Sequence, residues 1–367
     1  MRVLHVINSL ELAGAEVLLA DLVPRLQRSG IRTSIALLNR TDTRLDRSLR
    51  EIPGCEIFGT RRNVRSPLQV AWLAKLFGRF DVVHSHLFPS QFWVAAAAKI
   101  GRTRAKLVTT EHGHSNNRRG KRLWYGPDVW MYTRYDRIVC NSQATAEALH
   151  QWVPSTTSRT IVIPNGIDLD RFDRDRPSRD PGAQLTAIFV ARLNPEKDHL
   201  TLLRAMKTVP DLRLKLVGDG SLRSELEATV AEFGLNNRVE FLGWRDNVSE
   251  LLSCADIYVH STHFEGFAIA VAEAMAAGLP TVASNVPGLS WVAGDAALLC
   301  KPGDSDDMAS QLRRLVGNKE LRKELGQRGR LRARQFSIDA TVSAHIHLYE
   351  SLVGPSQTAG APTSPES

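Results

Sequence analysis

Short apolar strands alternate with helical stretches along almost the whole chain, and this alternation constrains the fold more than any other feature. In the first half, the strand candidates lie at residues 2–9, 33–38, 81–87, 106–112, 136–142 and 160–166. In the second half, they lie at residues 185–193, 212–220, 239–244, 255–261, 279–285 and 296–302. Because a helix between two strands makes those strands parallel and covers one face of their sheet, the pattern predicts an α/β fold with two doubly wound parallel sheets.

The segment 168–184, DLDRFDRDRPSRDPGAQ, separates the two series. It is polar, dense in charge and without apolar periodicity, so it is the expected linker. We therefore expect a first domain at 1–167 and a second domain at 185–337. The helical stretch 338–352 is expected to cross back to the first domain, and the tail 354–367, which has no aliphatic cluster, is expected to be disordered.

The composition is that of an ordinary globular protein, with 43% hydrophobic and 23% charged residues in a chain of 367. No apolar run is long enough to cross a bilayer, and the chain opens on a strand rather than on a signal peptide's charged and apolar segments. A cytoplasmic location is therefore expected. The cysteines have neither metal nor redox spacing and are expected to be small core residues: Cys55, Cys140, Cys254 and Cys300.

Positive charge is concentrated in the first part of the chain. Residues 1–150 hold 23 of the 47 Lys and Arg side chains but 12 of the 39 Asp and Glu side chains. The surplus gathers in two basic clusters, one formed by Arg61, Arg62 and Arg65 and the other by Arg118, Arg119, Lys121 and Arg122, which runs into Trp124 and Tyr125. Basic residues beside aromatics suit an anionic membrane surface, and the alternatives are a solvated basic face or a nucleic-acid patch. We expect a weak peripheral membrane contact and no nucleic-acid partner, since no nucleic-acid motif is present.

The stretch EGFAIAVAE carries two glutamates, Glu265 and Glu273, at a junction of strand, tight loop and helix. Between them, the amides of Ile269 and Ala270 lie in the first helical turn, where they lack intrahelical partners and meet the positive end of the helix dipole. The junction is therefore expected to bind an anion such as a diphosphate, with the two carboxylates beside sugar hydroxyls. Two glutamates near a helix N-terminus can also be surface residues that the dipole favours.

The run ARLNPEKDH places Arg192 and Lys197 just after a strand, on either side of a proline turn. Two fixed cations can neutralise a diphosphate and stabilise it as a leaving group without a metal. The alternative is a pair of exposed surface cations.

Glycine-rich turns end two other strands of the second series, LVGDG at 216–220 and FLGW at 241–244. They offer Gly218 and the backbone of Leu242 as candidate contacts for a nucleotide, although glycines after strands are usually simple turns. Neither run has the GxGxxG fingerprint or a phosphate loop ending in Gly-Lys-Ser/Thr, which argues against a dehydrogenase or a nucleoside triphosphatase.

In the first domain, Gly14 lies before the first helix and permits close approach of the backbone to a ligand. His112 and His114 follow a strand, where a histidine can bond a sugar hydroxyl or stabilise charge, although a structural role is the commoner one. His84 and His86 are further candidates. Neither pair has the helical His-Glu-x-x-His spacing of a zinc peptidase, so we expect no bound metal.

Together these motifs resemble those of a known family. In chain order they are AGAE, HSH, TTEHG, IPNGID, ARLNPEKDH, VGDG, FLGW and EGFAIAVAEAMAAGLPTVAS. This series is similar to that of the retaining glycosyltransferases of the GT-B fold, specifically glycosyltransferase family 4. The resemblance covers residues 1 to about 352 and is most specific at 265–280.

The resemblance implies two Rossmann-like domains that face a central cleft. A nucleotide-sugar donor, either a UDP-sugar or a GDP-sugar, would be held mainly by the second domain, and the acceptor by the first. The implied reaction transfers a hexose to a glycan or lipid-linked acceptor in cell-surface polysaccharide biosynthesis, with no cofactor beyond the donor. The anomeric configuration would be retained, because the leaving phosphate assists deprotonation of the acceptor on the same face.

Residue roles follow from the motif positions. Glu273 would bind the ribose hydroxyls, and Glu265 the hydroxyls of the transferred sugar. His112 would contact that sugar at the reacting centre, while Arg192 and Lys197 would bind the diphosphate. The other donor contacts implied by the resemblance are Gly14, Gly218, Leu242, Gly266, Phe267, Ile269 and Ala270.

The chain departs from the family pattern at three positions. Ala13 precedes Gly14 where the family usually has two glycines, and Ala268 stands where it usually has a glycine. Asp198 follows Lys197 where a glycine is common, and its carboxylate could tune or weaken the positive field there. We interpret these departures as tolerated variation.

Two other functions remain open. A sugar-nucleotide epimerase or hydrolase could use the same scaffold, because a fold does not fix the chemistry. A non-catalytic protein that binds a nucleotide sugar is also conceivable, but it would be expected to lack Glu265, Arg192 or Lys197, all of which are present.

Overall fold

The computed structural model describes residues 1–11, 14–113, 118–174 and 182–354, and it contains two sheets whose strands all pair in parallel. The first sheet comprises β1 (Arg2–Ile7), β2 (Arg32–Leu37), β3 (Glu56–Gly59), β4 (Val82–His86), β5 (Lys106–Glu111), β6 (Arg137–Cys140) and β7 (Thr160–Val162). The second comprises β8 (Leu185–Val190), β9 (Leu212–Val217), β10 (Val239–Gly243), β11 (Ile257–His260), β12 (Thr281–Ser284) and β13 (Ala297–Cys300). The predicted fold class is confirmed.

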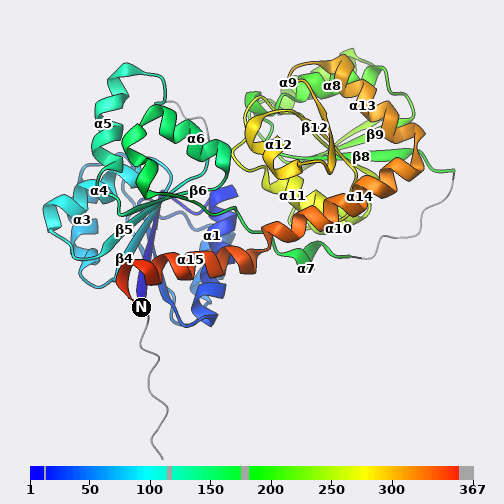
Figure 1. Cartoon of the computed structure of the whole chain (residues 1–367). Helices are drawn as coiled ribbons and strands as arrows, with labels where there is room; N and C mark the ends of the chain where they lie inside the picture. Colours follow the sequence, from blue (N-terminus) through cyan, green and yellow to red (C-terminus); the bar gives the residue numbers. More distant parts are fainter. Residues whose placement is uncertain (12–13, 114–117, 175–181, 355–367) are drawn as a thin grey trace, which may run out of the picture.

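Helices cover both faces of each sheet (Figure 1). In the first half they are α1 (Gly14–Arg28), α2 (Arg44–Arg50), α3 (Leu68–Phe77), α4 (Ser90–Gly101), α5 (Arg122–Tyr132), α6 (Gln143–Trp152) and the 3-10 turn η1 (Pro154–Arg159). The second half contains α7 (Leu169–Phe172), η2 (Pro195–Lys197), α8 (His199–Lys207), α9 (Arg223–Glu232), α10 (Val248–Ser253), α11 (Ile269–Ala276), α12 (Pro287–Ala293), α13 (Ser305–Gly317), α14 (Lys319–Ala333), η3 (Arg334–Phe336) and α15 (Ile338–Val353).

Burial explains why the sequence pattern indicated these elements so clearly. The strands β4, β11 and β12 are buried at every position, so they read as continuous runs rather than as alternating ones. Helix α13 buries Met308, Leu312 and Leu315 on one face and keeps charged residues on the other. Each sheet therefore has its own hydrophobic core.

The chain crosses twice between the domains, and the two crossing segments are paired. The amide of Ile167 donates to the carbonyl of Phe336 at 2.8 Å, and the amide of Ile338 donates to the carbonyl of Ile167 at 2.9 Å. Figure 1 shows α15 running back from the second domain alongside α1 of the first. Its residues Val342 and Tyr349 are buried in the core of the first domain.

Three details differ from the expectations. The edge strand β3 was missed, because its four residues are exposed or half-buried and carry no strong apolar pattern. The expected linker contains α7, whose Phe172 is buried in the core of the second domain. Cys254 is exposed rather than part of a core, whereas the other three cysteines are buried. Residues 175–181 of the linker and 355–367 of the tail lie outside the described residues.

The second basic cluster is partly internal, which corrects its interpretation as a surface patch. Arg118 pairs with Asp128 at 2.9 Å, and Arg119 pairs with Glu111 at 3.0 Å. All four side chains are less than 10% exposed. The surplus of free cations at the surface is therefore smaller than the sequence count suggests. Within the described ranges, no helix has both the length and the apolar character needed to cross a bilayer.

Both sheets contain a point where the strand order reverses. The first sheet runs β3-β2-β1-β4-β5-β6-β7, so β1 and β4 are neighbours, and the second runs β10-β9-β8-β11-β12-β13, so β8 and β11 are neighbours. Connections from two adjacent strands diverge at such a point, and the crevice beyond their carboxyl ends is the preferred place for a ligand. The loops at these ends face each other: a methyl group added to Gly266 would lie 2.3 Å from the carbonyl oxygen of His112.

Candidate active site

The loop after β11 is fixed by close backbone packing. A methyl group on Gly288, at the start of α12, would lie 2.1 Å from the carbonyl oxygen of Glu265, so only glycine allows α12 to approach this loop. The hydroxyl of Thr262 donates to the carbonyl of Phe264 at 2.9 Å and closes the turn from inside. Glu265 therefore occupies a defined position beyond β11.

Glu265 and Lys197 form an ion pair across the reversal point of the second sheet. The ammonium of Lys197 donates to Oε2 of Glu265, and Nε2 of His260 lies 3.4 Å from the same oxygen. Both partners of the ion pair are largely buried. Burial would raise the pKa of Glu265, but the charge of Lys197 and the contact with His260 outweigh it and lower that pKa to about 2.

Two buried residues behind this pair were missed by the sequence analysis. His260 shares a hydrogen bond of 3.0 Å between its Nδ1 and the hydroxyl of Tyr258. Tyr258 lies close enough to both Glu265 and Glu273 for their charges to raise its pKa, although its burial is the larger cause. Both residues lie within an apolar strand, where a polar side chain gives no signal that it faces the crevice.

Arg192 lies just beyond β8 with its side chain 62% exposed. Its nearest carboxylate is that of Glu196 at 3.9 Å, a separation that makes the pair weak. Its charge also reaches Glu16 of α1, whose pKa is raised by burial and lowered in part by Arg192. Arg192 thus lies between the two domains with a guanidinium available for a ligand.

Glu273 lies in the second turn of α11, in a small hollow between α1, α7 and α11 that Asp21 and Arg171 also line. Burial raises its pKa to about 7, and the charge of Arg171 opposes this only in part. Its carboxylate makes no hydrogen bond or ion pair with any other described residue. A buried carboxylate of this kind is suited to accept hydrogen bonds from a ligand.

The first domain contributes His112 and Gly14. The carbonyl of His112 accepts a hydrogen bond of 2.9 Å from the side-chain amide of Asn141. Nε2 of the His112 ring lies 3.4 Å from Nδ1 of His86. Gly14 begins α1, and a methyl group added there would lie 3.4 Å from Cδ1 of Ile269 in the second domain. Ala13 and His114 lie outside the described residues.

The remaining candidates are glycines or residues whose side chains are partly or fully buried. A methyl group on Gly218 would lie 2.0 Å from the carbonyl of Ala191, so the turn after β9 packs directly on the end of β8. Leu242 is half-buried on the edge strand β10. Phe267 is 2% exposed and packs against Trp291, so only its backbone is available to a ligand. Helix α11 begins at Ile269 after Ala268, which adopts a left-handed conformation and caps no amide of the first turn with its side chain.

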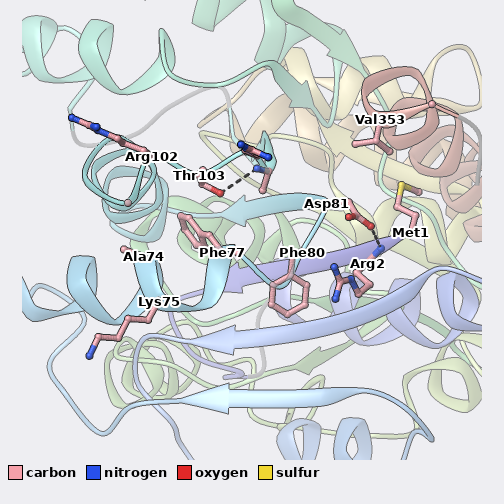
Figure 2. Close-up of a pocket in the computed structure, with 15 residues that line it drawn as sticks. Met1, Arg2, Ala74, Lys75, Phe77, Phe80, Asp81, Arg102, Thr103 and Val353 are labelled. Atoms are coloured by element: carbon pink, nitrogen blue, oxygen red, sulfur yellow. Dashed lines mark hydrogen bonds between the residues drawn. The ribbon is translucent and has the colours of Figure 1, made fainter.

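A larger hollow lies at the opposite end of the first sheet. It encloses about 700 Å³ and is lined by Arg2, Lys75, Phe77 and Arg102 among other residues. In Figure 2, Lys75 and Arg102 point away from each other rather than toward a common point. None of the predicted site residues lies there, so volume alone does not identify the active site.

Comparisons with known proteins identify the family of the chain. The family model described as "Glycosyltransferase Family 4" matches residues 12–171, and the one described as "Glycosyl transferases group 1" matches residues 170–332. The chain belongs to the family 4 glycosyltransferases of the GT-B fold. It is therefore a transferase, as the motifs indicated.

The chain is similar to bacterial glycosyltransferases and to a solved structure of the same fold. The lipopolysaccharide core biosynthesis glycosyltransferase LpsE of Rhizobium meliloti is 30% identical over 234 residues, which cover 62% of this chain and 68% of LpsE. A UDP-Gal:alpha-D-GlcNAc-diphosphoundecaprenol alpha-1,3-galactosyltransferase of Escherichia coli is 26% identical, with 66% of this chain and 68% of that enzyme covered. The crystal structure of Anabaena HepE in complex with UDP has the same fold, with a TM-score of 0.83, 23% identity, and coverage of 96% of this chain and 100% of that one.

Proposed function

We propose that the protein is a retaining, metal-independent hexosyltransferase that moves a hexose from a nucleoside diphosphate to a glycan or lipid-linked acceptor. The observation that carries this proposal is the Lys197–Glu265 pair, which lies at the reversal point of the second sheet and opposite His112 of the first domain. A cation for the leaving diphosphate and an acceptor for sugar hydroxyls therefore meet at one position.

The donor half of the site combines three kinds of group. Lys197 and Arg192 supply positive charge, and the free amides at the start of α11 point in the direction that favours an anion. Glu273 offers a carboxylate without a partner among the described residues, which suits the two hydroxyls of a ribose. Because solved HepE structures contain UDP and UDP-glucose, a UDP-hexose is the first donor to test.

The low pKa of Glu265 limits its role. A carboxylate with a pKa of about 2 is a weak base, so it holds hydroxyls of the transferred sugar rather than removing the acceptor's proton. That proton passes to an oxygen of the departing diphosphate. The bond between the anomeric carbon and the acceptor oxygen forms as the bond to the diphosphate breaks, on the same face, and the configuration is retained. When the donor enters, Lys197 keeps its contact with Glu265 and donates another of its three ammonium protons to a phosphate oxygen.

The acceptor belongs to the first domain in this proposal. Relatives that act in lipopolysaccharide core synthesis and on a diphosphoundecaprenol acceptor support cell-surface polysaccharide as the setting. Near the start of α5, Leu123 is 85% exposed and Tyr125 is 46% exposed, beside the exposed cations Lys121 and Arg122. This group suits peripheral contact with an anionic membrane at the cytoplasmic face.

Binding to vesicles of anionic lipid tests the membrane contact and should weaken as salt rises. Binding that does not depend on salt, or no binding, would refute the membrane contact.

The donor can be identified without knowing the acceptor. Thermal shifts with UDP and GDP, followed by their hexose conjugates, should show stabilisation by one nucleotide that grows with concentration. Transfer is then measured with that donor, with and without a chelator, and the anomeric configuration of the product is determined by NMR. Retained configuration and unchanged rate in chelator are the expected results.

Variants test the residue assignment. Glu265→Ala and Lys197→Ala should each remove nearly all turnover, whereas Glu232→Ala and Lys323→Ala, matched changes at exposed helical positions, should not. Full activity in both of the first two variants would refute the assignment. Incubation of the donor without acceptor separates the alternatives, because an epimerised donor or rapid hydrolysis would indicate an epimerase or a hydrolase.

A further inference from the structure

Three histidines form a buried line that ends at the candidate active site. His5, His86 and His112 come from the neighbouring strand ends of β1, β4 and β5. Nδ1 of His5 lies 3.0 Å from Nε2 of His86, and Nδ1 of His86 lies 3.4 Å from Nε2 of His112. The rings of His5 and His86 are stacked with centroids 5.3 Å apart. Each histidine thus contacts the next through one nitrogen.

Neighbouring histidines do not belong to this line. Both nitrogens of His84 have other partners at 2.7 Å, the hydroxyls of Tyr349 and Thr110. His345 donates from Nδ1 to the carbonyl of Thr341 at 2.8 Å. His5, His84 and His86 do lie within the spacing that could hold a metal, with ligand atoms within 4.8 Å of one another. Hydrogen bonds already account for these contacts, so we assign no metal here.

Burial keeps the three histidines neutral at physiological pH. It lowers the pKa of His5 to about 3 and that of His112 to about 4, with a smaller contribution from His345 in both cases. The pKa of His86 is lowered for the same main reason. A neutral imidazole carries a single N–H, on either Nδ1 or Nε2, and the other nitrogen accepts.

A single N–H on each ring couples the three tautomers. If His86 carries its proton on Nδ1, it donates to His112 and accepts from Nδ1 of His5, so all three rings are Nδ1–H. If His86 carries its proton on Nε2, the direction of both hydrogen bonds reverses and all three rings are Nε2–H. No other arrangement of neutral rings satisfies both contacts.

The far end of the line distinguishes these two arrangements. Nε2 of His5 is buried and has no hydrogen-bond partner among the described residues. In the Nδ1–H arrangement this atom is a bare acceptor, whereas in the Nε2–H arrangement it is a buried N–H with nothing to receive it. Orphaned buried donors are rarer than unused acceptors in native proteins, so the Nδ1–H arrangement is favoured.

We propose that His86 and His5 are positioning residues that hold His112 in its Nδ1–H form, so that His112 presents a hydrogen-bond donor to the sugar in the cleft. The Nδ1 of His112 makes no hydrogen bond with another described residue and is not among the buried unpartnered atoms, so it is open to a ligand. A donor at this position stabilises an oxygen of the transferred hexose and cannot act as a base. The consequence for catalysis rests on the proposed function, whereas the tautomer itself does not.

The tautomer is measured on the ligand-free protein. With selectively labelled ¹⁵N-histidine, long-range ¹H–¹⁵N spectra distinguish Nδ1–H from Nε2–H, and the loss of one signal set in His112→Gln assigns that residue. We expect Nδ1–H for His112. Because a free histidine side chain favours Nε2–H, this result would mean that its neighbours impose the form. An Nε2–H signal from His112 in the wild-type protein would overturn the proposal.

Variants separate positioning from general packing. His86→Leu should return His112 to the Nε2–H form and lower kcat at least tenfold, whereas His86→Asn, whose amide can still donate, should retain Nδ1–H and most of the activity. His345→Gln, a change at a buried histidine outside the line, should leave the tautomer of His112 unchanged. An unaltered tautomer in a folded His86→Leu would refute the coupling. If Glu265→Ala and Lys197→Ala remain active while His112 is Nδ1–H, the proposed function fails and the tautomer inference stands.

Discussion

Gly266→Ala offers the sharpest test of whether the two domains must meet at the candidate site. The added methyl carbon would lie 2.3 Å from the carbonyl oxygen of His112 and 2.9 Å from Cα of Gly113. Both atoms are backbone atoms, so no side chain can rotate away. Since an unstrained contact of carbon and oxygen is about 3.3 Å, the loops must separate by about 1 Å.

The separation should reduce catalysis more than folding. The two loops belong to different domains, so we expect a small shift between the domains, rather than repacking within either core, to relieve the contact. A displacement of about 1 Å at the reacting groups can reduce the rate about 100-fold. We therefore expect kcat/KM to fall about 100-fold while the unfolding free energy changes by less than about 1 kcal/mol, a typical surface effect.

Transfer kinetics and thermal unfolding, measured on the same preparation, decide this prediction. Gly317→Ala is the matched control, because a methyl group there lies more than 4 Å from the other described residues outside its own helix, and its activity should equal that of the wild type. Activity within threefold of the wild type would refute the need for this close approach, and a large loss of Tm would assign the effect to folding instead.

Two further predictions concern stability. The folded pKa of Glu273, about 7, lies above its ordinary value of 4.5, so the folded state loses stability as pH rises from 4.5 to about 7, by up to about 3 kcal/mol. Glu273→Gln should therefore be more stable than the wild type in urea at pH 8 but not at pH 4. An equal gain in stability at both pH values would contradict the raised pKa of Glu273. Asp198 caps α8 through the amide of Thr201 and has a φ of 43°. Asp198→Ala removes the cap and should lower the unfolding free energy by about 1 kcal/mol. Asp198→Gly should lower it less, because glycine adopts the left-handed backbone without strain. The reverse order of the two variants in thermal unfolding would refute this reasoning.

The fold was predictable because its strands are buried on both faces. A strand such as β4, with no exposed position, must be apolar or internally hydrogen-bonded throughout, and such runs between helices leave one architecture. The edge strand β3 is exposed or half-buried, so its residues need not be apolar and its sequence shows no apolar run. Linear motifs placed Arg192, Lys197 and Glu265 beyond strand ends, and Glu273 in the helix that follows β11, and strand ends converge in a doubly wound sheet.

The contacts within the site could not be predicted, because they depend on packing between elements. Nothing in the spacing of Lys197 and Glu265 indicates that they form an ion pair before a ligand arrives, or that His260 lies 3.4 Å from the same carboxylate. The coupling of His5 to His112 likewise requires the order of β1, β4 and β5 in the sheet. These contacts depend on which strands are neighbours in the sheet, and motif spacing in the sequence does not give the strand order.

The departures from the family pattern acquire a physical explanation in the backbone. Asp198 and Ala268 both stand where the family commonly has glycine, and both adopt positive φ, 43° and 55°. A glycine at such a position supplies left-handed backbone at no steric cost, so the family preference follows from conformation rather than from room for phosphate. Asp198 replaces that advantage with a helix cap, because its carboxylate accepts a hydrogen bond from the amide of Thr201 and lies 3.5 Å from His263. Both substitutions therefore keep a left-handed backbone at these positions without the freedom that glycine provides.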